Sequence, residues 1–294
     1  MNAMEKKKVL VFGEILYDIF GDERKLGGAP LNFACHFAQL GGDAVMISAV
    51  GNDAMGREAL EEAASYGVDV ARVAISEKPT GFCRVTLKGG APSYDLVYPV
   101  AYDEITAKDI PARADGVYFG TLAQRGDISR NTLEKILENV SGKTFFDINI
   151  RQRYYDAGMV GYSLEKADVL KVSREEIGVF EELGLCDTSE PEKVCVSLAK
   201  KYKIGTVIVT LDKDGAFVYD AENDSVIYSR KPEGKPVSCV GAGDSFSAAY
   251  FHAMLCGETS EKCLERAITL SDHIVTVLGA VCRYPEDLKK RLEI

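Results

Sequence analysis

The stretch PVSCVGAGDSFSAAYFHAMLC, from Pro236 to Cys256, constrains the fold of this chain more than any other. A run able to form a strand, Val237–Val240, leads into Gly241-Ala242-Gly243-Asp244, and small and apolar residues then recur at helical spacing. A glycine turn that opens a helix points free backbone N–H groups at one spot, where the helix dipole is also positive. The glycines also let a ligand approach the backbone closely. The stretch therefore predicts a strand, an anion site and a helix, in that order.

Asp244 has two interpretations as the expected first residue of that helix. Aspartate is a good helix cap, so its role could be purely local. Alternatively, it is a general base that takes a hydroxyl proton while the neighbouring amides hold the charge of a transferring phosphoryl group. Spacing alone leaves both open.

Composition indicates a globular protein and argues against certain classes of binding partner. The 294 residues are 46% hydrophobic and 27% charged, with a net charge of −10, which argues against a nucleic-acid partner or an anionic membrane surface. The apolar run near the N-terminus is only about five residues, too short for a signal peptide or a membrane span. Eight scattered cysteines without a C-x-x-C pair, and only three histidines, predict neither a disulfide framework nor a zinc site. We therefore expect a cytoplasmic protein.

Apolar strands alternate with helical patterns along most of the chain, which predicts an α/β fold. The continuous apolar run Lys8–Gly13 is typical of a strand buried in a parallel sheet, and it delivers Glu14 and Asp18 to the ligand-binding edge of that sheet. Further strands are expected at Val45–Val50, Gly116–Phe119, Thr144–Ile148, Asp168–Val172, Thr206–Leu211 and Gly215–Tyr219. Helices are expected at Leu31–Gln39, Met55–Tyr66, Ser129–Asn139, Pro191–Tyr202 and Ser260–Leu278, and one opening at Ser173-Arg174-Glu175-Glu176.

Three other segments alternate apolar with polar residues. They are Val73–Ile75, Phe82–Leu87 and Tyr94–Tyr98, with Gly89-Gly90 between the last two. Such alternation predicts half-exposed antiparallel strands. We expect them to form a small lid on the edge of the sheet.

The motif GAGDSF resembles the C-terminal signature of the ribokinase-like (PfkB) carbohydrate kinases. The segments GEILYDIF, LGGAPLNFACHFAQLGG, AVGNDAMGREALEEAASYGVDV and PVAYD are similar to the bacterial fructokinases of that family. The resemblance implies one ribokinase-like α/β domain over residues 1–294, a mostly parallel central sheet flanked by helices, and a small β lid from about 15–25 and 80–103. Lids of this family often pair between two subunits, so a homodimer is possible.

On the acceptor side, the resemblance implies that Asp244 is the catalytic base and that Gly241, Ala242 and Gly243 form the anion hole. It implies that Asp18, Gly28 and Asn32 bind sugar hydroxyls, and carboxylates and amides can each bridge adjacent hydroxyls. Without it, Gly27-Gly28 is a turn in the loop Lys25–Pro30, and Asn32 a residue of a helix start. Arg151, in FDINIRQ, is either a surface cation or a clamp on phosphate, and the resemblance favours the clamp.

On the donor side, the resemblance implies that Thr210, Gly215 and Gly243 bind ATP and that Glu176 reaches the Mg²⁺ shell. Glu176 could instead be a first-turn acid that complements a helix dipole. No Walker A sequence and no strand-linked G-x-G-x-x-G is present, which argues against a P-loop kinase or a Rossmann dehydrogenase.

Four positions depart from the pattern of the family: Ser173 stands for asparagine, Asp212 for glycine, and Ser238-Cys239 for Asp-Thr. The change at Ser238 puts a monovalent cation site in doubt. The sequence thus predicts an ATP- and Mg²⁺-dependent kinase for a small sugar, with fructose as first choice. The alternatives are a kinase for another sugar or a nucleoside, and a weakly active or inactive sugar-binding homologue.

Overall fold

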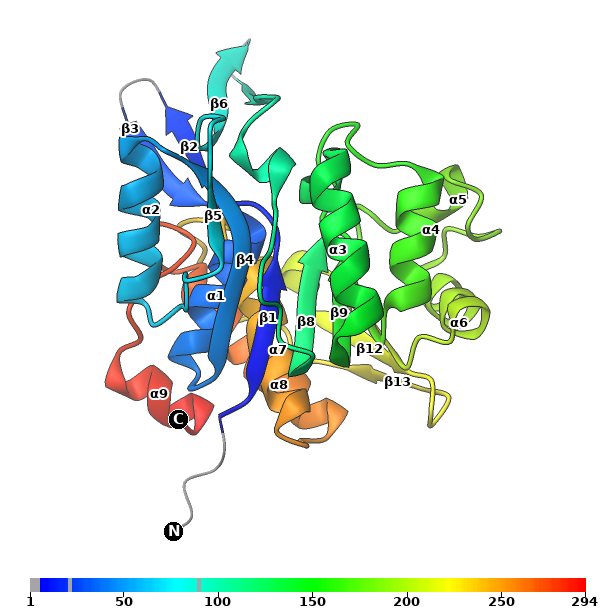
Figure 1. Cartoon of the computed structure of the whole chain (residues 1–294). Coiled ribbons are helices and arrows are strands. Elements are labelled where there is room, and N and C mark those ends of the chain that lie inside the picture. The colour runs from blue at the N-terminus through cyan, green and yellow to red at the C-terminus, as the bar shows by residue number, and fades with distance from the viewer. Residues whose placement is uncertain (1–5, 21–22, 89–90) are drawn as a thin grey trace.

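The computed structural model describes residues 6–20, 23–88 and 91–294, and the expected Gly89-Gly90 turn lies outside them. A nine-stranded sheet runs through the molecule in the order β13-β12-β11-β10-β9-β8-β1-β4-β5 (Figure 1). Neighbouring strands are parallel from β5 to β11, and only β12 and β13 are antiparallel. The strands are β1 Lys8–Phe12, β4 Asp43–Gly51, β5 Val73–Ser76, β8 Arg113–Gly120, β9 Ser141–Asp147, β10 Val169–Ser173, β11 Thr206–Thr210, β12 Ala216–Asp220 and β13 Ser225–Tyr228.

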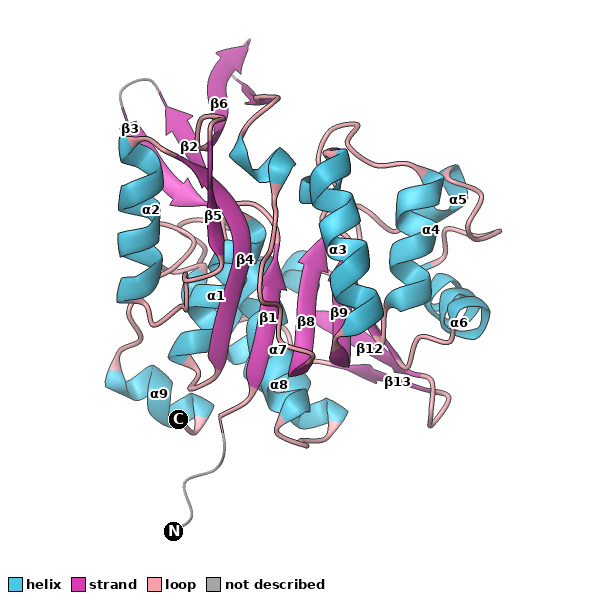
Figure 2. Ribbon diagram, viewed as in Figure 1, coloured by secondary structure: helices cyan, strands magenta, loops and turns pink. Residues whose placement is uncertain are grey.

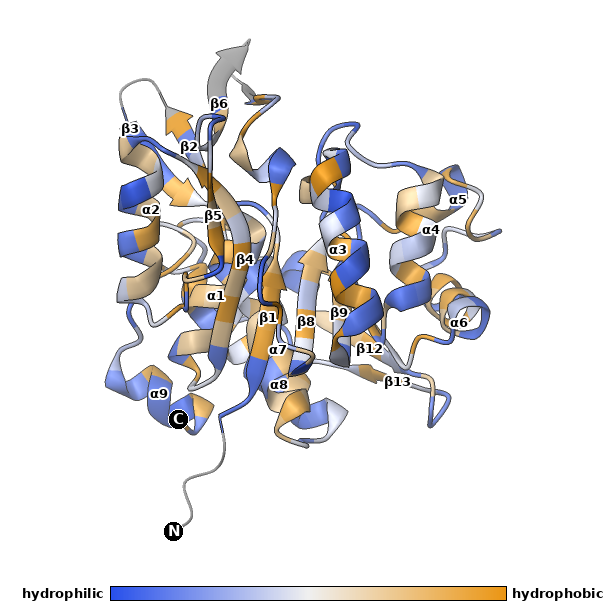
Figure 3. Cartoon of the chain, viewed as in Figure 1, coloured by the Kyte–Doolittle hydropathy of each residue, from blue (hydrophilic) through white to orange (hydrophobic). Residues whose placement is uncertain are grey.

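Helices cover both faces of this sheet, as Figure 2 shows. They are α1 Ala29–Gln39, α2 Ala54–Ser65, α3 Asp127–Asn139, α4 Ala157–Lys166, α5 Val179–Glu182, α6 Pro191–Tyr202, α7 Ala242–Leu255, α8 Ser260–Ile274 and α9 Glu286–Leu292. Because both faces are covered, the central strands read as continuous apolar runs, and β1 and β4 are largely orange in Figure 3.

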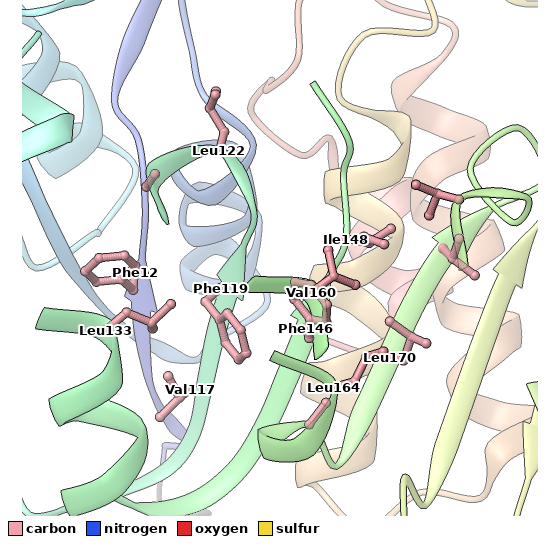
Figure 4. Packing of buried hydrophobic residues seen from close by; sticks show 14 of the residues in the cluster. Phe12, Val117, Phe119, Leu122, Leu133, Phe146, Ile148, Val160, Leu164 and Leu170 are labelled. Carbon is pink, nitrogen blue, oxygen red and sulfur yellow. The ribbon is translucent and has the colours of Figure 1, made fainter. Parts of the chain in front are cut away.

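The core has two halves, one on each face of the sheet. On the α3, α4 and α6 side, Phe12, Phe119 and Phe146 pack with Leu133 and Leu164, part of the cluster in Figure 4. On the other side, aromatic residues of α1 and α7 pack against β8 and β9. This second half anchors the two helices whose first turns carry the candidate site.

A second, four-stranded sheet has the order β3-β2-β6-β7 and lies at the top of Figure 1. Its strands are β2 Leu16–Phe20, β3 Glu23–Gly27, β6 Gly81–Lys88 and β7 Ala91–Leu96. The predicted fold class is therefore confirmed: a large, mostly parallel sheet flanked by helices, with a small sheet beside it. Among the residues with described placement, no helix is long and apolar enough to cross a membrane.

Three predictions of secondary structure are wrong, one in the direction of strand pairing and two in the type of element. Val73–Ile75 was expected to be antiparallel, but β5 pairs in parallel with β4 at the edge of the main sheet. The sequence pattern misled because a half-exposed edge strand of a parallel sheet alternates apolar and polar residues in the same way. Val237–Val240 is a loop, in which Val237 and Val240 are 61% and 56% exposed. The segment after Ser173 makes turns, and helix α5 begins only at Val179.

Several other predicted segments begin or end at different residues in the structure. The Lys25–Pro30 segment is not a loop: β3 extends to Gly27, and α1 already begins at Ala29. The expected long helix Ser260–Leu278 ends at Ile274. Helix α7 begins at Ala242, so Asp244 is its third residue and not its first.

Candidate active site

The first turns of α1 and α7 meet, and their side chains are hydrogen-bonded. The Asn32 amide Nδ2 donates to Asp244 Oδ2 at 2.8 Å, across 212 positions of sequence. Asn32 is buried, and Asp244 is partly exposed. The structure therefore brings together Asn32, which was predicted to bind the sugar, and Asp244, which was predicted to be the base.

The turn before Asp244 is built as its glycines require. Gly241 has a φ of 80°, and a Cβ on it would lie 2.4 Å from the carbonyl oxygen of Ala280, so only glycine fits. The Ala242 N–H donates to the Cys239 carbonyl at 3.3 Å. The amides of Gly243 and Asp244 belong to the first helical turn, where the helix itself offers no acceptor. They are the better donors for a bound anion, and Ala242 is a poorer one than its sequence position suggests.

The environment of Asp244 suits a proton acceptor. Burial, together with the nearby charge of Asp147, raises its pKa to about 6, against the lowering effects of the Asn32 hydrogen bond and of the charges of Lys171 and Arg151. A base with a pKa just below neutral is ionised at pH 7 and still accepts a proton readily.

Glu14 is a second buried acid at the same edge of the sheet, only 4% exposed. Burial raises its pKa to about 7, with opposing contributions from backbone amides and from the charge of Arg151. Gly28 makes this packing possible, since a Cβ there would lie 2.5 Å from the Glu14 carbonyl oxygen at a φ of 106°. The sequence placed Glu14 at this edge but gave it no role.

Asp18 and Arg151 face the same region from the small sheet and from the loop after β9. Burial raises the pKa of Asp18, and the Arg151 charge lowers it. The Arg151 side chain is exposed, and its hydrogen bond goes to the adjacent Ile150 carbonyl at 3.2 Å. Its charge acts on Glu14, Asp18 and Asp244 together.

Thr210 and Gly215 lie at the carboxyl end of β11, on either side of the 3₁₀ turn Asp212–Asp214. Gly215 has a φ of 95°, and a Cβ there would lie 2.6 Å from Ser229 Oγ. Asp212, which stands where the family has glycine, itself has a φ of 53°. The conformation that glycine would favour is thus kept in spite of the substitution.

Glu176 has both carboxylate oxygens engaged. Oε1 accepts from the Ile150 N–H at 2.7 Å and Oε2 from the Ser173 N–H at 2.9 Å. The carboxylate thereby ties the loop after β9 to the end of β10. Each oxygen keeps a lone pair for a metal-bound water, but over the described part of the chain no three His, Cys, Asp or Glu side chains gather as a metal site.

Sequence reasoning missed Lys171, a lysine buried in the middle of β10. Its Nζ lies 3.1 and 3.2 Å from the two carboxylate oxygens of Asp147. The available signal was a charged residue inside the apolar run DVLKVS, since lysine is almost never buried without a partner.

Comparison with known proteins identifies the family. The model of the pfkB family carbohydrate kinases matches residues 6–286. The chain belongs to this family. It is 31% identical to a putative sugar kinase of Pyrococcus horikoshii over 83% of this chain and 81% of that protein. It is 29% identical to a fructokinase of Escherichia coli, over 95% and 96% of the two chains. It is also 26% identical to an aminoimidazole riboside kinase of Salmonella typhimurium, over 84% and 80%.

Solved structures agree on the fold. The Pyrococcus horikoshii kinase in complex with ATP aligns with a TM-score of 0.78 at 27% identity, covering 96% of this chain and 99% of that one. The Vibrio cholerae fructokinase bound to fructose and ADP aligns with a TM-score of 0.83 at 22% identity, covering 97% and 99%. The predicted family is confirmed, and the chain is an ATP-dependent carbohydrate kinase.

Proposed function

We propose that this kinase is a fructokinase, in which Asp244 deprotonates a fructose hydroxyl that attacks the γ-phosphate of ATP. The observation that carries the proposal is the Asn32–Asp244 hydrogen bond of 2.8 Å at the first turn of α7. It holds a carboxylate with a pKa of about 6 beside the free amides of a helix N-terminus. A base next to an anion site is the arrangement that transfer to a hydroxyl requires.

The sugar would lie between α1, the small sheet and the loop after β9. The Asn32 amide gives an N–H to Asp244 and keeps its carbonyl oxygen to accept from a hydroxyl. Asp18 would accept from further hydroxyls, with Gly28 leaving room for the sugar. Positioning by these groups would convert the attack into an in-line, effectively unimolecular step.

The transferring phosphoryl group would lie at the Gly243 and Asp244 amides, with Arg151 facing its charge. The turn of Gly241 and Ala242 shapes this hole. Thr210 and Gly215 would contact the nucleotide. Mg²⁺ bound to ATP would neutralise phosphate charge, and Glu176 would accept from its water ligands, since this ion keeps several waters and needs few protein carboxylates.

We further propose that residues 1–294 act as one domain and that the small sheet is a lid over the sugar. Its strands β2, β3, β6 and β7 come from two separate segments and stand beside the carboxyl end of β1. A second copy of the chain would pair with this sheet in a homodimer. Light scattering on the purified protein tests the dimer, and a mass near 32.0 kDa at micromolar concentration would exclude it.

A kinase for another sugar or for a nucleoside is the second candidate, supported by the similarity to an aminoimidazole riboside kinase. The substitutions Ser173, Asp212, Ser238 and Cys239 favour weak activity. A screen of ATP-dependent turnover over hexoses, pentoses and nucleosides separates these cases. We expect the highest kcat/KM with fructose; a higher value with a nucleoside would refute the assignment, and no turnover would favour a binding protein.

A further inference from the structure

A buried ion pair lies directly beneath the first turn of α7. Lys171 and Asp147 are adjacent in the pairing of β10 with β9, and their side chains are 8% and 1% exposed. Lys171 Nζ contacts both Asp147 oxygens, at 3.1 and 3.2 Å. The charges of Asp147, Glu176 and Asp244 raise the pKa of Lys171, so the ammonium stays charged in spite of its burial.

Both partners touch the helix that carries the base. A Cβ built on Gly243 would come within 3.2 Å of Lys171 Nζ, so the ammonium lies close to the backbone of the anion-binding turn. Ser247 Oγ lies 3.1 Å from Asp147 Oδ2 and 2.9 Å from the Gly243 carbonyl oxygen, and its proton can serve either. The Tyr118 hydroxyl also donates to Asp147 Oδ2, at 3.2 Å.

A buried ion pair of this kind is expected to contribute little net stability to the folded protein. Moving two charges out of water costs several kcal/mol per ion, and well-packed apolar residues often replace such a pair at no loss of stability. The residues on either side of Lys171 in β10 are apolar and buried: Val169, Leu170 and Val172 are at most 1% exposed. A lysine in this strand, close to the turn that would hold the phosphoryl group, suggests a role in that transfer.

We propose that Lys171 and Asp147 form a charged platform that positions the first turn of α7 and keeps Asp244 ready to accept a proton. Lys171 is thus a positioning residue: it makes no bond to substrate and exchanges no proton. The inference rests on the proposed role of Asp244. The positive charge of Lys171 lies close to the turn and faces the negative charge that ATP would bring above it, while Asp147 holds the ammonium in place.

Groups from several elements act on Asp244 and set the direction of each test, and among them Tyr118 of β8 also interacts with its charge. Asn32 comes from α1, Glu14 from the end of β1, Asp147 and the Arg151 loop from β9, and Lys171 from β10. The negative charge of Asp147 raises the pKa of Asp244, whereas Lys171, Arg151 and the Asn32 hydrogen bond lower it. Ionised Asp244 in turn raises the pKa of Glu14, so the reciprocal effect is also upward. Single substitutions in the platform should therefore shift Asp244 in opposite directions.

The test is a titration of the Asp244 carboxyl by ¹³C NMR, with the signal assigned by its loss in Asp244→Asn. It needs no substrate, so it stands even if fructose is not phosphorylated. We expect the midpoint to rise by about one pH unit in Lys171→Met, a tenfold change in proton affinity, and to fall in Asp147→Asn. Lys143→Met is the matched control, because Lys143 makes an exposed ion pair with Asp168 on the same sheet and should leave the midpoint unchanged.

Turnover then separates positioning from a structural role. We expect the acid limb of the pH profile of kcat/KM, measured with ATP and fructose, to follow the NMR midpoint, and Lys171→Arg to restore part of the rate. Lys171→Met could fail to fold, because it leaves Asp147 unpaired. Asp147→Asn, which keeps the shape of the side chain, then decides the matter. An unchanged midpoint in folded Asp147→Asn would overturn the proposal, as would shifts in the same direction for both variants.

Discussion

Removing the amide of Asn32 should make Asp244 a base that works only at higher pH. The side chain donates a hydrogen bond of 2.8 Å to the Asp244 carboxylate. That bond stabilises the ionised form, against the burial that raises the pKa of Asp244 to about 6. In Asn32→Ala, burial remains and the bond is lost, so the pKa must rise.

The size of the shift follows from the energy of the bond. A hydrogen bond to a charged group contributes about 1.5–3 kcal/mol. At 1.36 kcal/mol per pKa unit, its loss moves the pKa up by about 1–2 units, to about 7–8. The ionised fraction of Asp244 at pH 7 would then fall from about nine tenths to between about a half and a tenth. Protonation alone thus costs about twofold to tenfold in rate at pH 7, and this part recovers by pH 9.

The assay is the pH profile of kcat/KM with ATP and fructose between pH 5 and about 9, where the acid limb reports the base of the free enzyme. Gln39→Ala is the control: it removes an amide from the same helix that donates to the Cys282 carbonyl at 3.1 Å and not to the base. Its limb should match that of the unmodified protein. A loss in Asn32→Ala that is equal at every pH would refute the reasoning and leave Asn32 with a role in sugar binding alone.

Three further predictions concern other parts of the site. Asp18→Ala should weaken fructose binding by about 1–3 kcal/mol in calorimetry, because sugar hydroxyls lose their partner; unchanged binding would place the sugar elsewhere. Turnover should respond little to potassium, and Ser238→Asp should create a dependence, since a hydroxyl is a poorer ligand for a hard cation than a carboxylate. Strong activation of the unmodified protein, with ionic strength held by an organic cation, would contradict this. Gly241→Ala should lower the free energy of unfolding by about 1–3 kcal/mol, because of the positive φ and the contact with Ala280, whereas Gly178→Ala, in open space, should change it little.

Local signals were enough to predict the parallel sheet and the family. Buried strands such as β1 read as unbroken apolar runs, and the GAGD turn needs glycine at position 241 because of its positive φ and the close approach of Ala280. Edge strands carry a weaker signal, because exposure on one side gives β5 the same alternation as an antiparallel strand. The predicted strand at Val237–Val240 is wrong because of a tertiary contact. The Val237 and Ser238 N–H groups both donate to the Val275 carbonyl, so they are not available for hydrogen bonds to a neighbouring strand.

The sequence predicted only those residues of the candidate site that belong to recognisable motifs, and not the contacts between them. Asn32 and Asp244 each stood out in sequence, but nothing in the sequence says that one donates to the other. Glu176 was expected near metal, and its two bonds to backbone amides depend on how the ends of β9 and β10 lie in space. The Lys171–Asp147 pair is a contact between neighbouring strands 24 residues apart, which a single sequence does not reveal.

The most direct test of the account is the transfer of labelled γ-phosphate from ATP to fructose by Asp244→Asn, beside calorimetric binding of fructose to the same variant. Asparagine keeps the size of the side chain and an oxygen for the Asn32 amide, but it cannot accept the hydroxyl proton. We predict that transfer falls by about a hundredfold or more while fructose binding is kept. Transfer close to that of the unmodified protein would contradict the central claim, because Asp244 would then not be the base.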